Sequence, residues 1–314
     1  MITDRDALVT VGIPTYNRPE GLQRTLEAIA GQSYRNLEII VSDNCSTDPN
    51  VRKIVETYLL KDARVRYHRH DSNIGAISNF FSLLDLAQGD YFMWAADDDW
   101  WDQDFVEVSV ESLQNHPSAS VALTRFQPLP DPSGKIRKVP PSFDKIKAFE
   151  KPIMADRLET YILQRDTFGK AHVIYGMFPL PVLKHCTNLL KSIVEPVMPV
   201  GEFYRMDVFL NAIILTQGEL VTSEPCLRRY NYEPRGGGHS VSRVLRGFDP
   251  HFHAYVQFML ELISRIEASE QVKQRLRRSL RLRKWLYYLE RIGRKLIVYR
   301  IYWSLYKRMA FDKR

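Results

Sequence analysis

The chain has 314 residues, of which 45% are hydrophobic and 26% are charged, so it can bury a sizeable core, and this composition argues against wholesale disorder. We expect no signal peptide, because the first residues are charged, and no membrane-spanning helix, because no stretch approaches ~18 uninterrupted apolar residues. The three cysteines are far apart and odd in number, which matches neither a disulfide framework nor a zinc cluster and favours the cytoplasm.

Strand-like and helix-like segments alternate through the first 126 residues. Strands are predicted at residues 8–13, 37–41, 65–68, 91–95 and 120–126, and helices at residues 19–31, 50–61, 76–87 and 103–115. Repeated strand–helix units predict an α/β fold with a mostly parallel central sheet flanked by helices. In such sheets, ligands bind beyond the carboxyl ends of the strands.

The remaining residues are less regular. Five prolines between residues 127 and 141 predict a surface loop, and residues 142–245 mix helices with short strands. The segment RGGGHS, residues 235–240, is typical of a flexible loop. From about Phe252 the apolar pattern is helical to the end of the chain.

The strongest chemical motif is YFMWAADDDWW, residues 91–101, in which three consecutive carboxylates follow an apolar strand. Neighbouring like charges are unfavourable unless cations or hydrogen-bond donors compensate them. Mg²⁺ is typically bound by one or two carboxylates together with phosphate oxygens and water. The alternative is an acidic helix N-terminus, where aspartate suits the helix dipole. The position at the end of a strand favours a cation site.

Two further polar segments follow strands, VGIPTYNR after the first and VSDNCSTD after the second. In the second segment, Asp43 could accept a hydrogen bond from a base N–H, and Asn44 could contact ribose or phosphate. Such residues are also ordinary turn formers. Their joint position at strand ends favours a ligand site.

Four motifs occur in an order and spacing that resemble glycosyltransferase family 2: PTYNR at residues 14–18, SDNCSTD at 42–48, SNIG at 72–75 and ADDDWW at 96–101. The resemblance covers residues 8–126 well and residues 170–240 more loosely. It implies a GT-A fold with a C-terminal helical extension. Residues 1–126 would form the nucleotide-sugar-binding subdomain, residues 127–250 the acceptor-binding subdomain of the same domain, and residues 251–314 a basic amphipathic helical region.

The resemblance also implies roles for individual residues. The nucleotide sugar would be bound by Pro14, Thr15, Tyr16, Asn17, Asp43, Asn44, Asn73, Gly75, Asp97 and Asp98. Mn²⁺ or Mg²⁺ would be the cofactor, with ligands drawn from Asp97, Asp99 and His239. The common form of the family's acidic motif has aspartate at the position of Ala96, so its frame stays open between Asp98 with Asp99 and Asp97 with Asp99.

Residues 201–221 are similar to the helix that carries the family's acidic general base. Asp207 fits the catalytic position best, and Glu202 is the second candidate. The plain alternatives are a solvated aspartate on an amphipathic helix and, for His239, a surface loop histidine. Residues 172–183 are similar to a segment that lines the acceptor side in many family members.

The resemblance implies an inverting, metal-dependent hexosyltransferase of bacterial polysaccharide assembly. It would move a sugar from a nucleotide-diphosphate donor to a hydroxyl of a saccharide or lipid-linked acceptor. One alternative is a sugar-1-phosphate nucleotidyltransferase, which usually needs a Gly-rich basic phosphate loop that PTYNR does not provide. The other is a catalytically inactive binding or scaffold protein with the same fold.

The net charge of +7 is unevenly distributed, because residues 265–314 hold 16 Lys and Arg against 4 Asp and Glu, whereas the rest of the chain holds 28 against 33. Aromatic and aliphatic residues alternate with these cations in a helical pattern, which suits a peripheral contact with an anionic membrane. A homo-oligomer interface is the main alternative, and nucleic acid is the least favoured partner. The expected location is the cytoplasm, peripheral on the inner face of the cell membrane.

Overall fold

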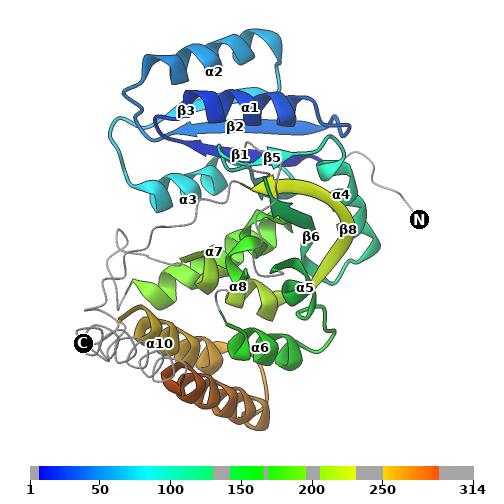
Figure 1. Cartoon of the computed structure of the whole chain (residues 1–314), viewed down its shortest axis with the longest axis vertical. Coiled ribbons are helices and arrows are strands. Elements are labelled where there is room, and N and C mark those ends of the chain that lie inside the picture. Colours follow the sequence, from blue (N-terminus) through cyan, green and yellow to red (C-terminus); the bar gives the residue numbers. More distant parts are fainter. Residues whose placement is uncertain (1–6, 130–141, 166–168, 196–205, 231–249, 290–314) are drawn as a thin grey trace, which may run out of the picture. The chain divides into compact units, whose positions relative to one another are not determined.

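The computed structural model describes residues 7–129, 142–165, 169–195, 206–230 and 250–289. The chain divides into two compact units, Met1–Glu233 and Pro234–Arg314, both traced in Figure 1. The first unit contains an eight-stranded mixed sheet in the order β3-β2-β1-β4-β7-β6-β8-β5. The predicted α/β architecture with a central sheet is confirmed.

The N-terminal half of the sheet is parallel. It consists of β1 (Val9–Thr15), β2 (Leu37–Asp43), β3 (Val65–Arg69) and β4 (Tyr91–Trp94). Two helices, α1 (Pro19–Ala30) and α2 (Pro49–Lys61), lie on one face of this half, and α3 (Ala76–Leu86) lies on the other (Figure 1). The carboxyl ends of these parallel strands therefore share one edge, where ligands bind in such sheets.

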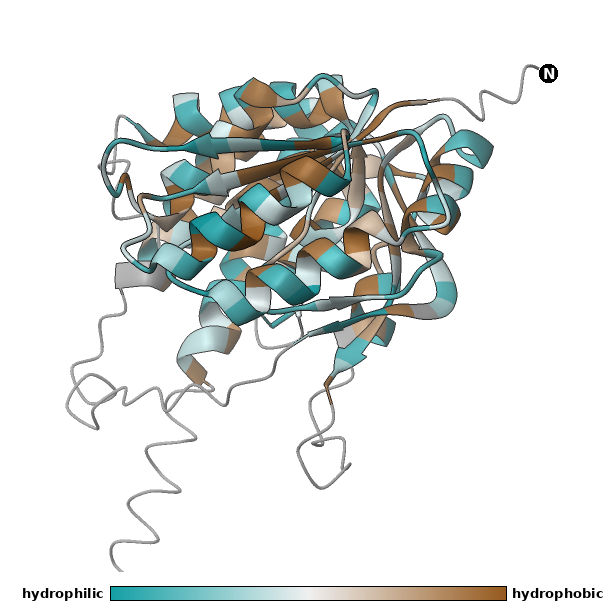
Figure 2. Ribbon diagram, turned by 90° about the horizontal axis from the view of Figure 1, so that it is seen from above, coloured by the Kyte–Doolittle hydropathy of each residue, from teal (hydrophilic) through white to brown (hydrophobic). Residues whose placement is uncertain are grey.

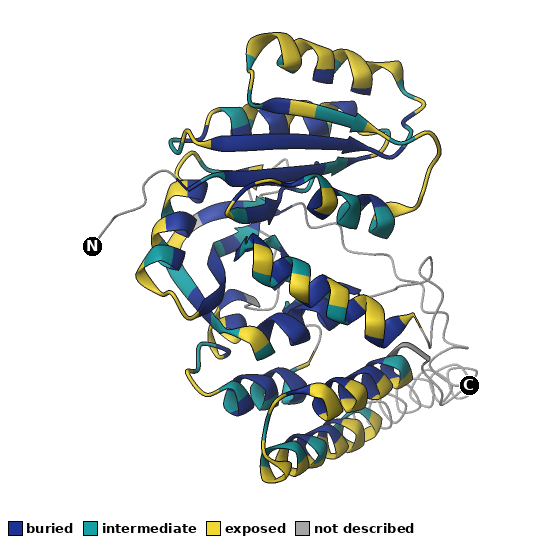
Figure 3. Cartoon of the chain, turned by 180° about the vertical axis from the view of Figure 1, so that it is seen from behind, coloured by how far each residue is buried: buried dark blue, intermediate teal, exposed yellow. Residues whose placement is uncertain are grey.

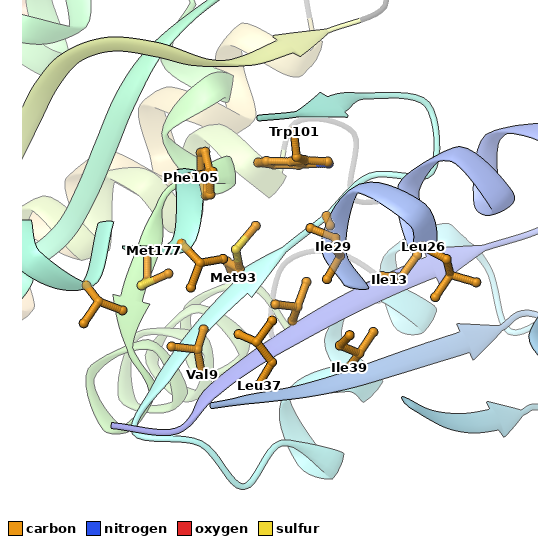
Figure 4. Close-up of a cluster of buried hydrophobic side chains, with 14 of the residues drawn as sticks. Val9, Ile13, Leu26, Ile29, Leu37, Ile39, Met93, Trp101, Phe105 and Met177 are labelled. Atoms are coloured by element: carbon orange, nitrogen blue, oxygen red, sulfur yellow. The ribbon is translucent and has the colours of Figure 1, made fainter. Parts of the chain in front are cut away.

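The strands alternate side chains between two packed faces. On one face, Ile13 joins Leu26 and Ile29 of α1 in the hydrophobic core (Figure 4). On the other face, a Cβ at Gly12 would lie 3.1 Å from Leu83, so α3 approaches β1 closely. Figure 2 shows hydrophobic residues concentrated on the strands, and Figure 3 shows that the outward side of α2 is exposed.

The other half of the sheet is mixed. β7 (Met177–Pro179) runs antiparallel to β4 and to β6 (Ala119–Pro128), and its first residue lies beside Met93 near the end of β4. β8 (Glu219–Tyr230) is parallel to β6, and β5 (Trp100–Trp101) pairs antiparallel with the end of β8. The helical elements of this half are α4 (Phe105–Asn115), α5 (Ser142–Lys147), α6 (Met154–Leu163), η2 (Lys170–Tyr175), α7 (Leu180–Val194) and α8 (Met206–Gln217).

The elements predicted for the first 126 residues are all present, each within two residues of its predicted bounds. The sequence does not predict β5, because two residues carry no periodic pattern. Helices and the short strand β7 are present after residue 142, as predicted, but β8 has 12 residues and is longer than the short strands predicted there. The flexible loop predicted at residues 235–240 lies outside the described residues.

The second unit is helical where it is described. It contains α10 (Pro250–Arg265) and a helix over residues 270–289. The two helices are linked by stacking of the Phe252 and Tyr287 rings, whose centroids are 3.8 Å apart. Across the described part of the chain, no helix combines the length and the apolar character that crossing a membrane requires.

Candidate active site

The first two polar motifs meet at the carboxyl ends of β1 and β2, where Thr15 is level with Asp43. Thr15 is 2% exposed, and its hydroxyl donates a hydrogen bond to Asp97 at 2.9 Å. Pro14 is half-buried at the same edge, whereas Tyr16 is 43% exposed. Tyr16 is therefore the side chain among these three consecutive residues that is most open to a ligand.

Asn17 holds the loop after β1 in place. Its φ of 53° is left-handed, a conformation that asparagine tolerates better than most residues. Its amide oxygen accepts hydrogen bonds from the backbone N–H groups of Thr47 at 2.8 Å and Asp48 at 3.0 Å. The side chain thus ties the first motif to the segment that begins α2.

Asp43 is 1% exposed and is surrounded by donors. One carboxylate oxygen accepts a hydrogen bond from the Ser46 N–H at 2.8 Å, and the other accepts one from the Tyr67 hydroxyl at 2.7 Å. The Nε of Arg69 lies 3.5 Å from the second oxygen. Burial, and next the hydrogen bond to Asp43, raise the pKa of Tyr67, so the phenol remains a donor at neutral pH.

Side-chain amides join the second and third motifs. Asn44 donates a hydrogen bond to Asn73 at 2.9 Å, and its own amide oxygen accepts one from the Ile74 N–H at 2.8 Å. The N–H of Gly75 also donates to Asn73 at 2.9 Å. Gly75 has a φ of 87°, which favours glycine, and it immediately precedes α3. The segment from Asn73 to Gly75 therefore borders the same edge of the sheet.

The three consecutive aspartates have different surroundings. Asp97 is 6% exposed, and its pKa is raised to about 6, chiefly because burial disfavours the charged form. One nitrogen of Arg18 lies 3.2 Å from a carboxylate oxygen of Asp97 and 2.9 Å from one of Asp98, whose side chain is 40% exposed. Asp99 is 5% exposed and forms a separate salt bridge of 2.9 Å with Arg228 of β8.

The backbone that carries these aspartates is fixed by α1. A Cβ at Gly21 would lie 2.0 Å from the carbonyl oxygen of Asp97, so only glycine fits at this point of the helix. The hydroxyl of Thr25, one turn later, donates a hydrogen bond to the Ala96 carbonyl at 3.2 Å. The position of the acidic motif therefore depends on close packing against α1.

Aromatic rings surround the Arg228 guanidinium. Its central carbon lies 4.2 Å from the centroid of Tyr175, 5.5 Å from that of Trp101, 5.6 Å from that of Phe126 and 5.9 Å from that of Tyr230. Cations are attracted to the faces of aromatic rings at such distances. The partner of the third aspartate is therefore a cation with a fixed position and little access to water.

Asp207, the first candidate for the general base, lies in the first turn of α8. Its charge reaches Tyr175, whose pKa is raised first by burial, then by Asp99 and, to a smaller extent, by Asp207. α8 also packs against η2, the segment that ends at Tyr175, because Asn211 donates a hydrogen bond to the Lys170 carbonyl at 2.8 Å. The second candidate, Glu202, and the metal-ligand candidate His239 both lie outside the described residues.

His172, in the segment expected on the acceptor side, stacks between Phe126 and Tyr230, with centroids 4.4 and 4.5 Å away. Burial, and next the positive charge of Arg228, lower its pKa to about 3. The imidazole is therefore neutral at physiological pH. It forms part of the aromatic surroundings of Arg228.

One positively charged side chain, Arg18, lies between the first two aspartates. Within the described ranges, no group of three or more His, Cys, Asp or Glu side chains is arranged to hold a metal ion. The oxygens of Asp97 and Asp98 nevertheless converge on a single positively charged atom, the Arg18 Nη1. Two carboxylates that meet at one cation match the protein ligands that Mg²⁺ takes beside phosphate oxygens.

Several residues of this site are missed by sequence reasoning. Arg18 is the last residue of PTYNR, and its place directly after the polar loop is the sign that could have revealed it. Tyr67 and Arg69 lie in the second half of β3, in a polar stretch that the sequence analysis interprets only as a strand. Arg228 lies in the RRY segment, but its partner Asp99 is 129 residues away, so spacing gives no indication of the pair.

The sequence is similar to that of known proteins. The model of the family described as "Glycosyl transferase family 2" matches residues 10–177. The putative teichuronic acid biosynthesis glycosyltransferase TuaG of Bacillus subtilis is 31% identical over 118 residues, which are 38% of this chain and 46% of TuaG. The chain spans less than half the length of the curated relatives that head the comparison.

Two solved structures share the fold. TarS of S. aureus (residues 1–349), in complex with UDP-GlcNAc, has a TM-score of 0.62 at 18% identity, covering 88% of this chain and 72% of that one. The mannosyltransferase PcManGT of Pyrobaculum calidifontis, in complex with GDP-Man and Mn²⁺, has a TM-score of 0.55 at 15% identity, covering 98% and 88%. The likeness confirms the GT-A fold. With the family model matching more than half of its length, the chain belongs to glycosyltransferase family 2.

Proposed function

We propose that this chain transfers a sugar from a nucleotide-diphosphate donor to a hydroxyl of a saccharide or lipid-linked acceptor in bacterial polysaccharide assembly. The observation that carries the proposal is the convergence of Asp97 and Asp98 on one cationic position beside Thr15, at the carboxyl end of the sheet. Residues 1–126 would bind the donor and residues 127–250 the acceptor. The names of TuaG, TarS and PcManGT, and the UDP-GlcNAc and GDP-Man complexes of the last two, support this reaction class.

We infer that Asp97 and Asp98 hold the cofactor, Mn²⁺ or Mg²⁺. Asp98 is the more exposed of the two, and Asp99 is already paired with a buried arginine. This choice differs from both frames that the sequence leaves open, because each of them includes Asp99. When bound, the metal ion would supply Lewis-acid stabilisation to the departing diphosphate.

Asp207 is the proposed general base. The acceptor hydroxyl has a high pKa and needs a carboxylate to take its proton as the new bond forms. The position of Asp207 in the first turn of α8, which packs against η2, supports this role. Direct attack of the hydroxyl on the side opposite the leaving group would invert the anomeric centre, and the leaving nucleoside diphosphate would carry away the bonding electron pair.

The first experiment is a thermal-shift screen of UDP-, GDP-, dTDP- and CMP-sugars with and without Mn²⁺, followed by a transfer assay with the donor that stabilises the protein. Stabilisation by a UDP-, GDP- or dTDP-sugar and release of the corresponding nucleoside diphosphate on adding acceptor are expected. Release of pyrophosphate from a nucleoside triphosphate and a sugar 1-phosphate would instead identify a nucleotidyltransferase. Donor binding without turnover by any acceptor would favour the inactive binding protein.

The second unit supports a peripheral membrane contact on the inner face of the cell membrane. The helix over residues 270–289 exposes four large apolar side chains, which are Leu282 (47%), Trp285 (59%), Tyr288 (40%) and Leu289 (42%). Arg278 and Arg281 are exposed one or two turns before Trp285, and residues 271–289 contain no acidic side chain. Cationic and aromatic side chains on one helix face suit an anionic lipid surface.

Sedimentation of the full chain with phosphatidylglycerol-containing vesicles tests this contact. Trp285→Ala should weaken binding, whereas Leu60→Ala, at a leucine that is 90% exposed on α2, should not. Equal sedimentation of both variants and the wild type would remove this face as the contact. A change in oligomeric state caused by Trp285→Ala, without a change in vesicle binding, would favour the homo-oligomer interface.

A further inference from the structure

The three aspartates of the acidic motif form salt bridges with two arginines, of which one is buried and the other is exposed. Arg228 is 2% exposed and holds Asp99, which is itself 6% exposed at its side chain. Arg18 is 57% exposed and holds both Asp97 and Asp98. One arginine is therefore a permanent part of the interior, and the other meets solvent.

Burial determines which of these pairs can be exchanged. Breaking the buried pair would leave an uncompensated charge among aromatic rings, which is strongly unfavourable. The pairs of Arg18 lose less when they open, because water solvates the guanidinium and Asp98, and the buried Asp97 keeps its hydrogen bond from Thr15. The guanidinium of Arg18 can therefore leave Asp97 and Asp98 at low cost.

A divalent cation and Arg18 would compete for the same oxygens. The Nη1 of Arg18 lies 3.2 Å from Asp97 Oδ1 and 2.9 Å from Asp98 Oδ2. A cation coordinated by these two carboxylates would place like charges side by side at that point, and the guanidinium would have to move. After moving, it would remain on the loop at the end of β1, next to any ligand that the cation holds.

We propose that Arg18 is an exchangeable counter-ion of the acidic motif, which neutralises Asp97 and Asp98 until a divalent cation replaces it and which then binds the diphosphate of the donor. The second half of this inference rests on the proposed function. A guanidinium has five N–H donors in a planar arrangement that matches phosphate oxygens. The same residue would thus stabilise the cation-free enzyme and contribute to donor binding.

The first test measures Mn²⁺ binding to the nucleotide-free full chain by isothermal titration calorimetry, at about pH 8, above the pKa of about 6 of Asp97. Arg18→Gln should tighten Mn²⁺ binding by roughly 2- to 10-fold, because the exposed guanidinium no longer competes for the two carboxylates. The matched control is Arg52→Gln, which removes another exposed arginine from a 2.8 Å pair with Glu56 on α2 and should leave Mn²⁺ affinity unchanged.

The second test measures UDP and GDP binding at saturating Mn²⁺. Arg18→Gln should weaken whichever nucleotide binds to the wild type, and Arg52→Gln should not. Unchanged or weaker Mn²⁺ binding by Arg18→Gln, or no Mn²⁺ binding by the wild type, would overturn the exchange. If the exchange is overturned in this way but the wild type still transfers sugar, the proposed function remains supported. Tighter Mn²⁺ binding by Arg18→Gln without any sugar transfer would refute the proposed function and keep the exchange.

Discussion

The Nε of Arg228 donates to a carboxylate oxygen of Asp99 at 2.9 Å, and both side chains are almost entirely buried. This salt bridge connects the acidic motif with β8, which also pairs with β5. Arg228→Met should destabilise the protein by about 3–5 kcal/mol, because it leaves the Asp99 charge buried without its partner. Urea denaturation followed by circular dichroism would measure this loss.

The neighbouring pair provides the control. Arg229 also binds an aspartate, Asp102, at 2.6 Å, but these side chains are 30% and 26% exposed. Arg229→Met should therefore cost clearly less, about 1 kcal/mol. Equal losses for the two variants would show that burial does not distinguish the pairs.

Asp98 and Asp99 should respond differently to removal of their charge. Asp98→Asn should reduce Mn²⁺ affinity at least 10-fold with little effect on stability, because its side chain is 40% exposed. Asp99→Asn should mainly destabilise the fold, because it breaks the buried pair with Arg228. Calorimetric Mn²⁺ titration and urea denaturation of both variants would separate these effects. The reverse pattern would return the metal site to Asp99.

Gly21→Ala should displace the acidic motif. The added Cβ would meet the Asp97 carbonyl at 2.0 Å, so α1 or the aspartate loop must move, at a cost of about 1–3 kcal/mol. Mn²⁺ affinity should fall together with stability. Gly31→Ala, at the end of the same helix, is the control, since its nearest contact is 3.1 Å away. Normal Mn²⁺ binding by Gly21→Ala would show that this packing does not position Asp97.

Asp207→Asn should lower the turnover number by about 10²–10⁴-fold, the usual contribution of a positioned base. Donor binding should remain unchanged, because the proposed role concerns only the acceptor proton. Steady-state kinetics and nucleotide titration of the variant would show whether the effect is confined to turnover. Equal loss of donor affinity would indicate that Asp207 supports the fold of the site instead.

His172 should make stability depend on pH. Its pKa is lowered to about 3 in the folded protein, against about 6.5 in an unfolded chain. Above pH ~6.5 the ring is neutral in both the folded and the unfolded protein, so the stability contributed by the buried neutral ring is fully present. Below that value only the unfolded state takes up the proton, so stability falls as the pH decreases towards the folded pKa.

His172→Phe should keep the stacking between Phe126 and Tyr230 and remove this proton. Between about pH 7 and pH 5, the unfolding free energy of the variant should therefore depend less steeply on pH than that of the wild type. The difference in slope corresponds to the uptake of up to one proton on unfolding. Urea denaturation across this range measures the slope, with the exposed His116→Phe as the control. Parallel slopes for wild type and His172→Phe would contradict the assignment.

The strand and helix pattern of the first 126 residues is predictable because it depends on local periodicity and on turns at strand ends. Asp43 and Thr15 could be placed together for the same reason, since adjacent parallel strands end at one edge. The role of Asn17 could not be derived, because a turn residue and a ligand residue look alike in sequence. The pairing of Asp99 with Arg228 depends on contacts between distant segments, which no periodic pattern encodes.

The reversed direction of β7 has a consequence for which segments of the chain meet at the acidic motif. β7 runs antiparallel to β4, so the start of β7 lies beside the end of β4. The residues just before β7, including Tyr175, therefore lie near the acidic motif that follows β4. Two stretches that are far apart in the sequence thus meet beside one acidic motif. A substitution just before β7 can therefore change the surroundings of the motif while the three aspartates stay the same.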